Sequence, residues 1–486
     1  MMLPQYRSFI AGNWQDSAEK CTIASPFHGE PVGTYFLANE AQVESAISAS
    51  VSAFQVFRKS SRYLRSAVLF SMARQMDLRR KELVQVIVQE AGKPLALAEG
   101  EVGRAIQTCT LAAEEVKRWG GEVIPVDIEA ASRGYELGVV RWVPRGPIFA
   151  ITPFNFPLNL IMHKVAPALA AGCSIMVKPP PQAPGAASLL SEIFASACEE
   201  IGDTKEKVPL ATLQVFSCTN ETAMRVVTDP RINTISFTGS ESVGWMLQEK
   251  ALRKHVVLEL GGNAGVIVHE DADLTRAAAR CAFGGYAYAG QVCISVQRIF
   301  VHAAVAVKFQ DLLLDAISHI QVGDPREPGV LVGPVIDTKS ADRVMSWIEE
   351  ALTQGATLLC GGTRVGNVIA PTLLTRVTPT LRISCEEVFG PVVVVDTYAE
   401  IDEAILAVNQ SRFGLQAGVF TNSQKIVQQV TEDLEVGGLL INDVPTYRAD
   451  HMPYGGVKGS GIGREGVRFA MEHFSERKTT MAWSGL

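Results

Sequence analysis

Short apolar runs alternate with amphipathic stretches from about residue 140 onward, and this alternation restricts the fold more than any other feature. The runs lie at 147–152, 173–179, 212–216 and 232–239. Between the second and the third, apolar residues recur at helical spacing on one face. Strands that alternate with helices build βαβ units, whose strands are parallel and whose helices cover both faces of the sheet. The sequence therefore predicts an α/β protein with a doubly wound, Rossmann-like parallel sheet.

A second series of the same kind begins near 255–268, continues through 297–302 and reaches a strand at 390–398. A chain of 486 residues is long enough for two or three domains. We therefore expect two α/β domains with a cleft between them.

Charge and cysteine content exclude several classes of function. The net charge of −7, without a long Lys/Arg run, gives no attraction to nucleic acid or anionic lipid. Nine cysteines without a CxxC pair or zinc spacing predict a reducing compartment and no metal site. The apolar stretch at 165–177 contains Pro167 and is shorter than the roughly 20 residues that span a bilayer. We expect a cytoplasmic protein whose partners are small molecules or copies of itself, not nucleic acid or membrane.

The segment 235–244 reads as a strand, a glycine turn and a helix, which is the arrangement that directs backbone N–H groups at a phosphate. Its pattern, G-S-x-x-x-G from Gly239 to Gly244, is weak by itself, and an ordinary turn explains it equally well. Lys178 ends another apolar run and would place an ammonium at the same sheet edge. The alternative for Lys178 is a solvated lysine at the end of a strand.

Six segments, in the same order and with similar spacing, resemble the signature segments of the aldehyde dehydrogenase superfamily. They are ITPFNFPLNLIMHKVAPALAAGCSIMVKPP, FTGSESVG, LELGGNAGVIV, GQVCISVQR, EEVFGPV and MPYGGVKGSGIGREG. The resemblance covers nearly the whole chain. It implies an enzyme that oxidises an aldehyde to an acid with NAD or NADP as cofactor.

The resemblance also implies a division of the chain. The expected parts are a dinucleotide-binding domain (1–122 and 145–254), a catalytic domain (255–445), an oligomerisation β extension (123–144 and 476–486), and a segment that returns to line the substrate mouth (446–475). Because relatives use such an extension for subunit contact, we expect a homodimer or homotetramer.

Three residues would carry the chemistry. Cys293 lies at the position of the family's nucleophile, and a thiolate is well suited to attack a carbonyl. Asn155 would stabilise the oxyanion together with the backbone N–H of Cys293, although an asparagine in such a turn often only caps its own loop. Glu259 ends an apolar strand, where desolvation would raise its pKa toward that of a general base. Its alternative is a carboxylate on an edge strand facing solvent.

Glu259 also separates sub-classes of the family. Members that pass the acyl group to coenzyme A typically lack this carboxylate, so hydrolysis to the free acid is favoured. A coenzyme A-acylating semialdehyde dehydrogenase stays open as an alternative. So does a structural protein that reuses the fold without catalysis, although that protein would lack one or more of the three catalytic residues.

The resemblance assigns a set of residues to the cofactor. They are Thr152, Phe154, Lys178, Gly239, Ser240, Gly244, Glu387 and Phe389. NAD-preferring relatives carry a glutamate three residues after the lysine, where this chain has Pro181. Without that carboxylate NADP is permitted, and the choice between NAD and NADP stays open.

Arg104, His163 and Arg448 fall in regions that line the substrate mouth in relatives. Basic side chains there would pair with an anionic group of the substrate, although each of the three alone is better explained as a surface or structural charge. As a set they resemble the branch that acts on lactaldehyde, phosphonoacetaldehyde or, without phosphorylation, glyceraldehyde 3-phosphate. Val292 stands where several anion-binding relatives carry arginine, which argues against a phosphonate specialist. We expect a short, polar or anionic aliphatic aldehyde.

Overall fold

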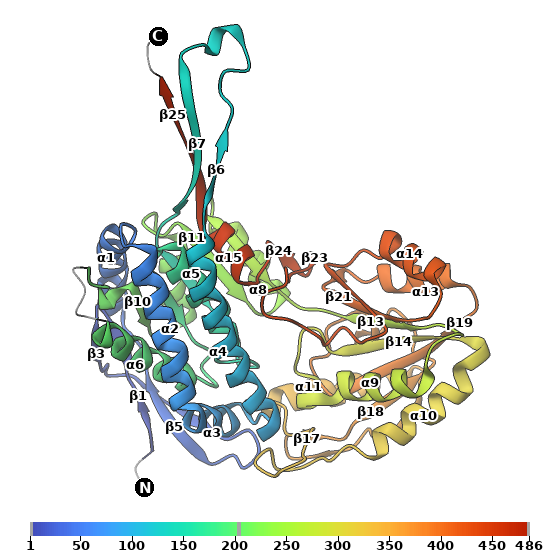
Figure 1. Cartoon of the computed structure of the whole chain (residues 1–486). Coiled ribbons are helices and arrows are strands. Elements are labelled where there is room, and N and C mark those ends of the chain that lie inside the picture. Colours follow the sequence, from blue (N-terminus) through green and yellow to red (C-terminus); the bar gives the residue numbers. More distant parts are fainter. Residues whose placement is uncertain (1–2, 202–205, 484–486) are drawn as a thin grey trace.

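Two twisted sheets with helices on both faces, and a narrow three-stranded arm, make up the protein (Figure 1). The computed structural model describes residues 3–201 and 206–483. None of the helices within these ranges is long and apolar enough to cross a membrane. The architecture confirms the predicted α/β fold with a Rossmann-like parallel sheet.

The first large sheet has eight strands in the order β24-β12-β11-β8-β9-β10-β2-β3. Five neighbouring strands, from β12 to β10, are parallel; β24 and β2 pair antiparallel with the two ends of this group, and β3 pairs antiparallel with β2. The strands are β2 (Ser8–Ile10), β3 (Asn13–Gln15), β8 (Ile148–Ile151), β9 (Ile175–Lys178), β10 (Leu213–Val215), β11 (Thr234–Thr238), β12 (His255–Glu259) and β24 (Gly461–Ile462).

Helices cover both faces of this sheet because its strands alternate apolar side chains between two cores. In β8, Ile148 and Ala150 face one core while Phe149 faces the other. The first core is closed by α2 (Arg62–Leu78), α3 (Arg80–Ala91), α4 (Leu95–Arg118), α5 (Asn159–Ala171), α6 (Gly185–Glu200) and α15 (Val467–His473), and the second by α1 (Glu40–Phe57), α7 (Asn220–Thr228) and α8 (Glu241–Lys250).

The second large sheet has seven strands in the order β15-β18-β19-β14-β13-β21-β22, all parallel except β15. Its strands are β13 (Ala264–Val268), β14 (Val296–His302), β15 (Thr357–Cys360), β18 (Thr372–Thr375), β19 (Val392–Tyr398), β21 (Gln416–Phe420) and β22 (Gly438–Ile441). Its helices are α9 (Leu274–Tyr286), α10 (Ala306–Ser318), α11 (Thr338–Thr353), α12 (Arg382–Cys385), α13 (Ile401–Asn409) and α14 (Gln424–Asp433).

The chain changes sheet after Glu259 and not at residue 255, where the catalytic domain was expected to begin. β12 pairs in parallel with β11 along its full length, which keeps it in the first sheet. The second sheet starts only with β13, on the far side of Gly261 and Gly262. Glu259 therefore lies at the junction between the two sheets.

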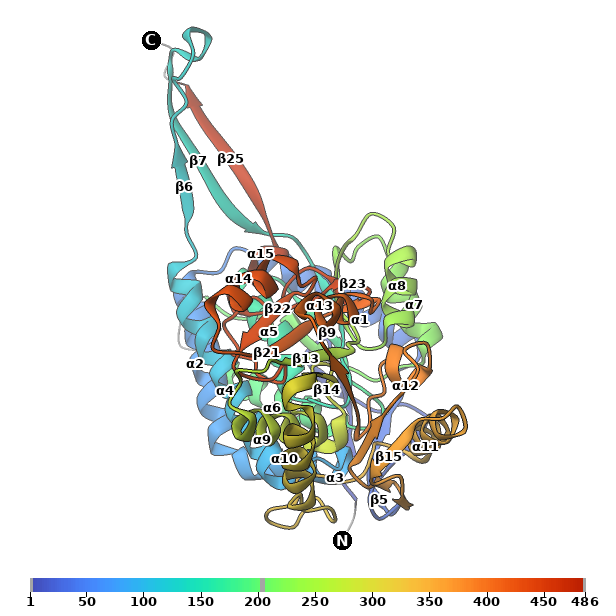
Figure 2. The same cartoon turned by 90° about the vertical axis from the view of Figure 1, so that its right-hand side faces the viewer.

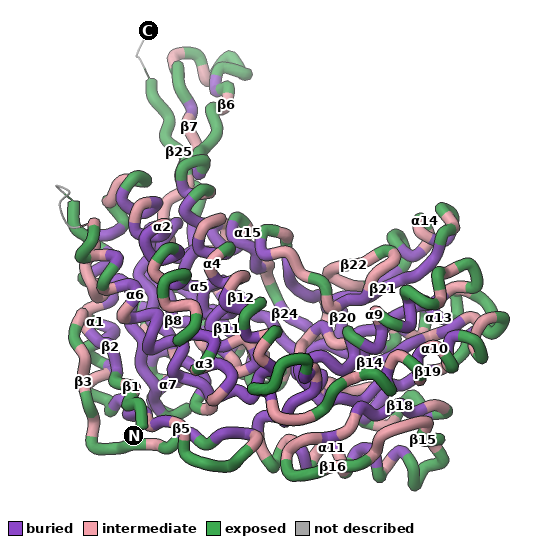
Figure 3. Tube along the Cα trace, turned by 60° about the horizontal axis from the view of Figure 1, so that its bottom comes forward, coloured by how far each residue is buried: buried purple, intermediate pink, exposed green. Residues whose placement is uncertain are grey.

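The arm projects from the first sheet as a long ribbon (Figures 1 and 2). It contains β6 (Gly121–Ile124), β7 (Tyr135–Pro144) and β25 (Ser475–Trp483), with β7 in the middle and both pairings antiparallel. Most of its residues are exposed, in contrast to the body (Figure 3). Small sheets complete the fold: β1 (Gln5–Tyr6) with β5 (Pro31–Phe36) and β4 (Lys20–Ala24), β16 (Arg364–Val365) with β17 (Val368–Ile369), and β20 (Phe413–Gly414) with β23 (Val457–Lys458).

Candidate active site

A cavity of about 430 Å³ lies where the carboxyl ends of β8, β11 and β12 meet the segment before β14. Crevices at the carboxyl ends of parallel strands are where α/β sheets bind ligands. The cavity brings together most residues that the sequence singled out. On its wall are Arg104, Phe154, Asn155, Gly239, Ser240, Glu259, Cys293, Glu387, Phe389 and Arg448. Thr152, His163, Lys178 and Gly244 do not line it.

Cys293 is carried by a turn that breaks away from α9. Tyr288 and Ala289 have positive φ angles of 54°, a conformation that costs non-glycine residues on the order of 1 kcal/mol and ends the helical path. The Cys293 thiol lies 3.0 Å from the Tyr454 hydroxyl. Burial raises the pKa of Cys293 to about 12, and the contact with Tyr454 works in the opposite direction. The thiol therefore needs stabilisation of its anion before it can act as a nucleophile.

The Asn155 side chain is held in place by a hydrogen bond that uses one of its two amide hydrogens. Its Nδ2 donates to the carbonyl of Gln291, 2.9 Å away, beside the Cys293 turn. An amide nitrogen carries two hydrogens, so this bond fixes the plane of the amide and leaves the second hydrogen for another acceptor. The contact joins the loop after β8 to the loop before β14.

A buried ion pair fixes the backbone around Asn155. Lys93 donates to the Asn155 carbonyl at 2.8 Å and to Glu101 at 2.6 Å, with both charged side chains buried. Glu101 in turn accepts the N–H groups of Leu158 and Asn159 at the start of α5. We call this Lys93–Glu101 pair the clamp. It fixes the loop to α4, because each buried charge has its hydrogen-bonding groups satisfied by the other or by the backbone of the loop.

The Glu259 carboxyl is buried, and neither of its oxygens has a hydrogen-bond partner among the described residues. Burial, reinforced by the nearby Glu465 carboxylate, raises the pKa of Glu259 well above its usual value. The two following glycines allow the close packing here. A Cβ on Gly261 would come within 2.6 Å of Glu387 Oε2, and one on Gly262 within 2.2 Å of the Cys293 carbonyl oxygen.

Several predicted cofactor residues surround one end of the cavity. Ser240 precedes the first turn of α8, and its side chain makes no capping bond there. Glu387 accepts the N–H of Gly262 at 3.0 Å, and burial raises its pKa to about 7. Phe154 and Phe389 meet edge to face with centroids 5.9 Å apart.

The remaining cofactor residues lie off the cavity wall. Lys178 ends β9, its side chain forms no hydrogen bond or ion pair with any residue in the described ranges, and burial lowers the pKa of its ammonium. Gly244 is buried in α8, where a Cβ would come within 2.3 Å of Leu260. Gly244 thus serves helix packing. Thr152 is buried beyond the end of β8, and its hydroxyl has no partner within the described part of the chain.

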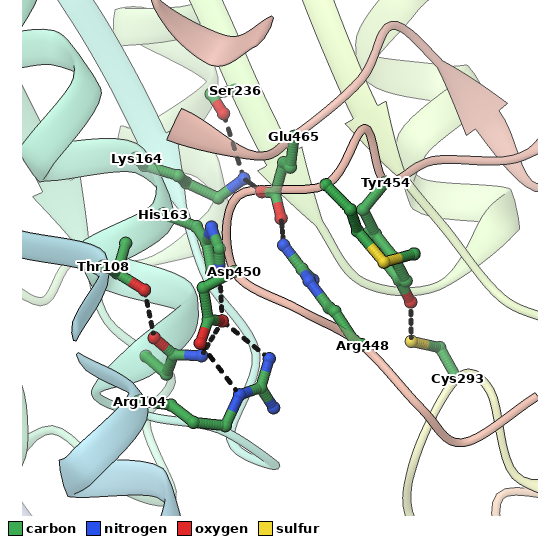
Figure 4. Close-up of polar contacts among 12 residues, drawn as sticks. Arg104, Thr108, His163, Lys164, Ser236, Cys293, Arg448, Asp450, Tyr454 and Glu465 are labelled. Atoms are coloured by element: carbon green, nitrogen blue, oxygen red, sulfur yellow. Dashed lines mark hydrogen bonds and ion pairs between the residues drawn. The ribbon is translucent and has the colours of Figure 1, made fainter. Parts of the chain in front are cut away.

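Asp450 gathers two of the predicted substrate residues. It accepts bonds from Arg104 at 2.7 and 3.2 Å, and it lies 2.9 Å from His163 Nε2 (Figure 4). Burial works to raise the pKa of Asp450, but His163 and Arg104 outweigh it and hold that pKa below its usual range. Burial, helped by the Arg448 charge, lowers the pKa of His163 to about 4. His163 is therefore a buried, neutral partner of Asp450.

Glu465 gathers a second set of charges. It forms ion pairs of 3.0 Å with both Arg448 and Lys164, and all three side chains are buried (Figure 4). Burial opposes the ionisation of Glu465, but the two cations outweigh it and lower its pKa to about 2. The Arg448 guanidinium also lies over the Tyr454 ring, 3.7 Å from its centroid. Arg448 lines the cavity, and its Nε has no partner among the described residues.

Sequence reasoning missed Tyr454, Asp450, Glu465 and Lys164. One signal was visible: Lys164 lies in the apolar run that forms α5, where a charge needs a buried partner. Its partner Glu465 is 301 positions away in sequence, so the sequence could not identify it.

The profile of the aldehyde dehydrogenase family matches residues 14–480. The chain belongs to the aldehyde dehydrogenase family. It is an NAD(P)-dependent oxidoreductase that acts on aldehydes. The predicted family, enzyme class and cofactor type are thereby confirmed.

Three relatives show which members of the aldehyde dehydrogenase family this chain is similar to. A 3-sulfolactaldehyde dehydrogenase of Priestia megaterium is 39% identical over 98% of this chain and 97% of its own length. Aldehyde dehydrogenase 21 of Physcomitrella patens, solved with its product succinate, superposes with a TM-score of 0.95 at 36% identity, covering 100% of this chain and 99% of that one. The glyceraldehyde-3-phosphate dehydrogenase of Methanocaldococcus jannaschii, solved with NADP, has a TM-score of 0.91 at 36% identity, covering 96% and 100%.

Proposed function

We propose that the enzyme oxidises a short aliphatic aldehyde with an anionic group to the free carboxylic acid. The observation that carries the proposal is that a thiol, an unpartnered carboxyl, a fixed amide and three guanidinium groups line one cavity. The first three serve the chemistry, and the arginines bind the substrate.

Cys293 is the proposed nucleophile. The thiol gives its proton to solvent, the thiolate sulfur forms a bond to the carbonyl carbon, and the π electrons of the carbonyl move onto the oxygen as an oxyanion. The free Nδ2 hydrogen of Asn155 and the backbone N–H of Cys293 donate to that oxyanion. Because the Lys93–Glu101 clamp fixes the Asn155 loop in advance, little reorganisation is needed when the charge develops.

Glu259 is the proposed general base for the second half-reaction. When bound, the dinucleotide would supply the hydride acceptor, and oxidation of the adduct would leave a thioester on Cys293. Glu259 takes a proton from water, the water oxygen bonds to the acyl carbon, and the carbon–sulfur bond breaks to release the acid and the Cys293 thiolate. A carboxyl with a raised pKa and no internal partner suits this work.

The charge of the site supports an anionic substrate. Arg104, Arg343 and Arg448 line the cavity with the carboxyls of Glu259 and Glu387, so its cationic side chains outnumber its carboxyls by one. Guanidinium groups suit planar or tetrahedral oxyanions. The relatives also support an anionic substrate, since their names and complexes specify a sulfonated aldehyde, a dicarboxylate product and a phosphorylated aldehyde.

For the cofactor, we propose that Ser240 and the first turn of α8 hold the pyrophosphate, and that Glu387 holds a ribose. The free N–H groups of a helix start attract phosphate, and Ser240 leaves its hydroxyl available there. Phe154 and Phe389 would enclose the nicotinamide end. Lys178 would serve the adenosine side, since it lies unpaired at the end of β9. These surroundings fit a dinucleotide.

The proposal is tested with matched pairs of short aldehydes, with and without a carboxylate, sulfonate or phosphate. Each is assayed with NAD⁺ and NADP⁺, following both reduced cofactor and the product. We expect higher kcat/KM for the anionic member of each pair and the free acid as product. Equal kcat/KM within every pair would contradict the anionic substrate, and acyl-coenzyme A formation on adding coenzyme A would favour the acylating alternative.

The nucleophile is tested with Cys293→Ala. We expect no turnover, because no other thiol lines the cavity, and nearly unchanged affinity for NADP⁺ in a fluorescence titration. Cys21→Ala, a change in β4, is the control and should keep full activity. Sustained aldehyde oxidation by Cys293→Ala would contradict the proposed mechanism.

A further inference from the structure

We propose that the Tyr454 hydroxyl is the hydrogen-bond donor that stabilises the Cys293 thiolate, and that Arg448, stacked on the ring, strengthens this donor. The inference rests on the proposed function in taking Cys293 as the nucleophile. It adds a catalytic residue, because Tyr454 touches the reacting sulfur (Figure 4).

The Cys293 sulfur has no ion-pair partner among the described residues. Carboxyl groups oppose its ionisation instead, since Glu387 and Glu259 both raise its pKa. The hydrogen bond from Tyr454, at 3.0 Å, is the strongest influence that lowers it. A bond to a charged acceptor is roughly twice as strong as one between neutral groups, so it favours the thiolate over the thiol.

Tyr454 is fixed in the donor geometry. Its backbone N–H and carbonyl exchange hydrogen bonds of 3.0 and 2.6 Å with Glu465. Its ring is buried against Val292, Ile294 and Leu415. Burial raises the pKa of Tyr454 well above its usual value, with the Cys293 charge acting in the same direction. The phenol thus keeps its proton, and it remains a hydrogen-bond donor when the thiol releases its own proton to solvent.

Arg448 makes the phenol a stronger donor. Its guanidinium carbon lies 3.7 Å from the centre of the Tyr454 ring, and the ion pair with Glu465 holds it there. A cation over an aromatic face draws electron density from the ring and polarises the O–H bond. The positive charge of Arg448 also lowers the pKa of Cys293 through space, without direct contact with the sulfur.

The test measures the pKa of Cys293 in the full chain from the pH dependence of its alkylation by iodoacetamide. Mass spectrometry of the peptide that contains Cys293 separates it from the other cysteines. In Tyr454→Phe we expect a rise of about one pKa unit, which is about a tenfold slower alkylation below both pKa values. The acid limb of the kcat/KM profile should shift by the same amount. Tyr447→Phe, at an exposed neighbour in sequence, should change neither.

A second variant covers the case in which Tyr454→Phe misfolds. Replacing Tyr454 by 2-fluorotyrosine keeps its shape and makes a slightly stronger donor that still holds its proton more tightly than the thiol, and the Cys293 pKa should fall. An unchanged or oppositely shifted thiol pKa in these variants would overturn the inference. That failure differs from failure of the proposed function, in which Cys293→Ala would still oxidise aldehydes.

Discussion

At the scale of single residues, the role proposed for the buried carboxyl of Glu259 separates the two halves of the reaction. As the proposed base for thioester hydrolysis, Glu259 has no part in hydride loss. In Glu259→Gln we therefore expect a rapid burst of NADPH followed by a slow steady state, because only hydrolysis loses its base. Stopped-flow absorbance measures both phases, with Glu249→Gln on α8 as the control. Equal slowing of both phases would contradict the assignment.

The raised pKa of Glu259 also links stability to pH. The folded state holds this proton above the pKa of the unfolded chain, so the stabilisation is complete below about pH 4.5 and is lost as pH rises through the folded pKa. A glutamine at this position does not ionise, so its contribution to stability does not fall as the pH rises. Calorimetry should therefore give Glu259→Gln a higher Tm than the wild type at pH 9 and a smaller difference at pH 5. A difference independent of pH would contradict a raised pKa.

Sequence motifs located the residues that we propose for the chemistry but not the residues that hold them in place. Cys293, Asn155 and Glu259 each lie in a recognisable segment, and the cavity brings all three together. Asp450 and Arg104 are 346 positions apart in the sequence, so no local sequence pattern indicates that they pair. His163 was expected at the substrate mouth, whereas Asp450 draws it into the interior.

At the scale of elements, the loop between β8 and α5 depends on the Lys93–Glu101 clamp. In Lys93→Met the Asn155 carbonyl loses its donor and the Glu101 carboxylate is left buried without its cation, which typically costs about 3–5 kcal/mol. We expect a lower Tm and a lower kcat. Calorimetry and steady-state assays check both, with the exposed Lys81→Met on α3 as the control. A Lys93→Met enzyme with normal kcat and Tm would show that the clamp is dispensable.

The start of a helix can be predicted from the sequence where it depends on contacts between residues that are close in the chain. Asn39 and Gln42 form a reciprocal capping box, and α1 starts at Glu40. The sheet to which β12 belongs could not be predicted in this way, because the periodicity of apolar residues identifies a strand but not the strands that pair with it. β12 pairs with β11 although it reads continuously into β13.

At the scale of the whole molecule, we propose that the arm joins copies of the chain into a homodimer or homotetramer. It projects beyond the body and exposes Val123, Leu137 and Trp483 (Figure 2). The double change Val123→Asp with Leu137→Asp should give monomers by light scattering after size exclusion, because burying two carboxylates at an interface is costly. Val307→Asp, at an exposed site on α10, should leave the assembly intact. A monomeric wild type would contradict the proposal.

The most direct test of the central claim is to trap the acyl group on its sulfur. Glu259→Gln is mixed with NADP⁺ and an aldehyde substrate, quenched in acid during the slow phase and digested for mass spectrometry. The account predicts the mass of the acyl group on the peptide that contains Cys293, in amounts that match the NADPH burst. A full burst with an unmodified Cys293, or with the acyl group on another residue, would contradict it.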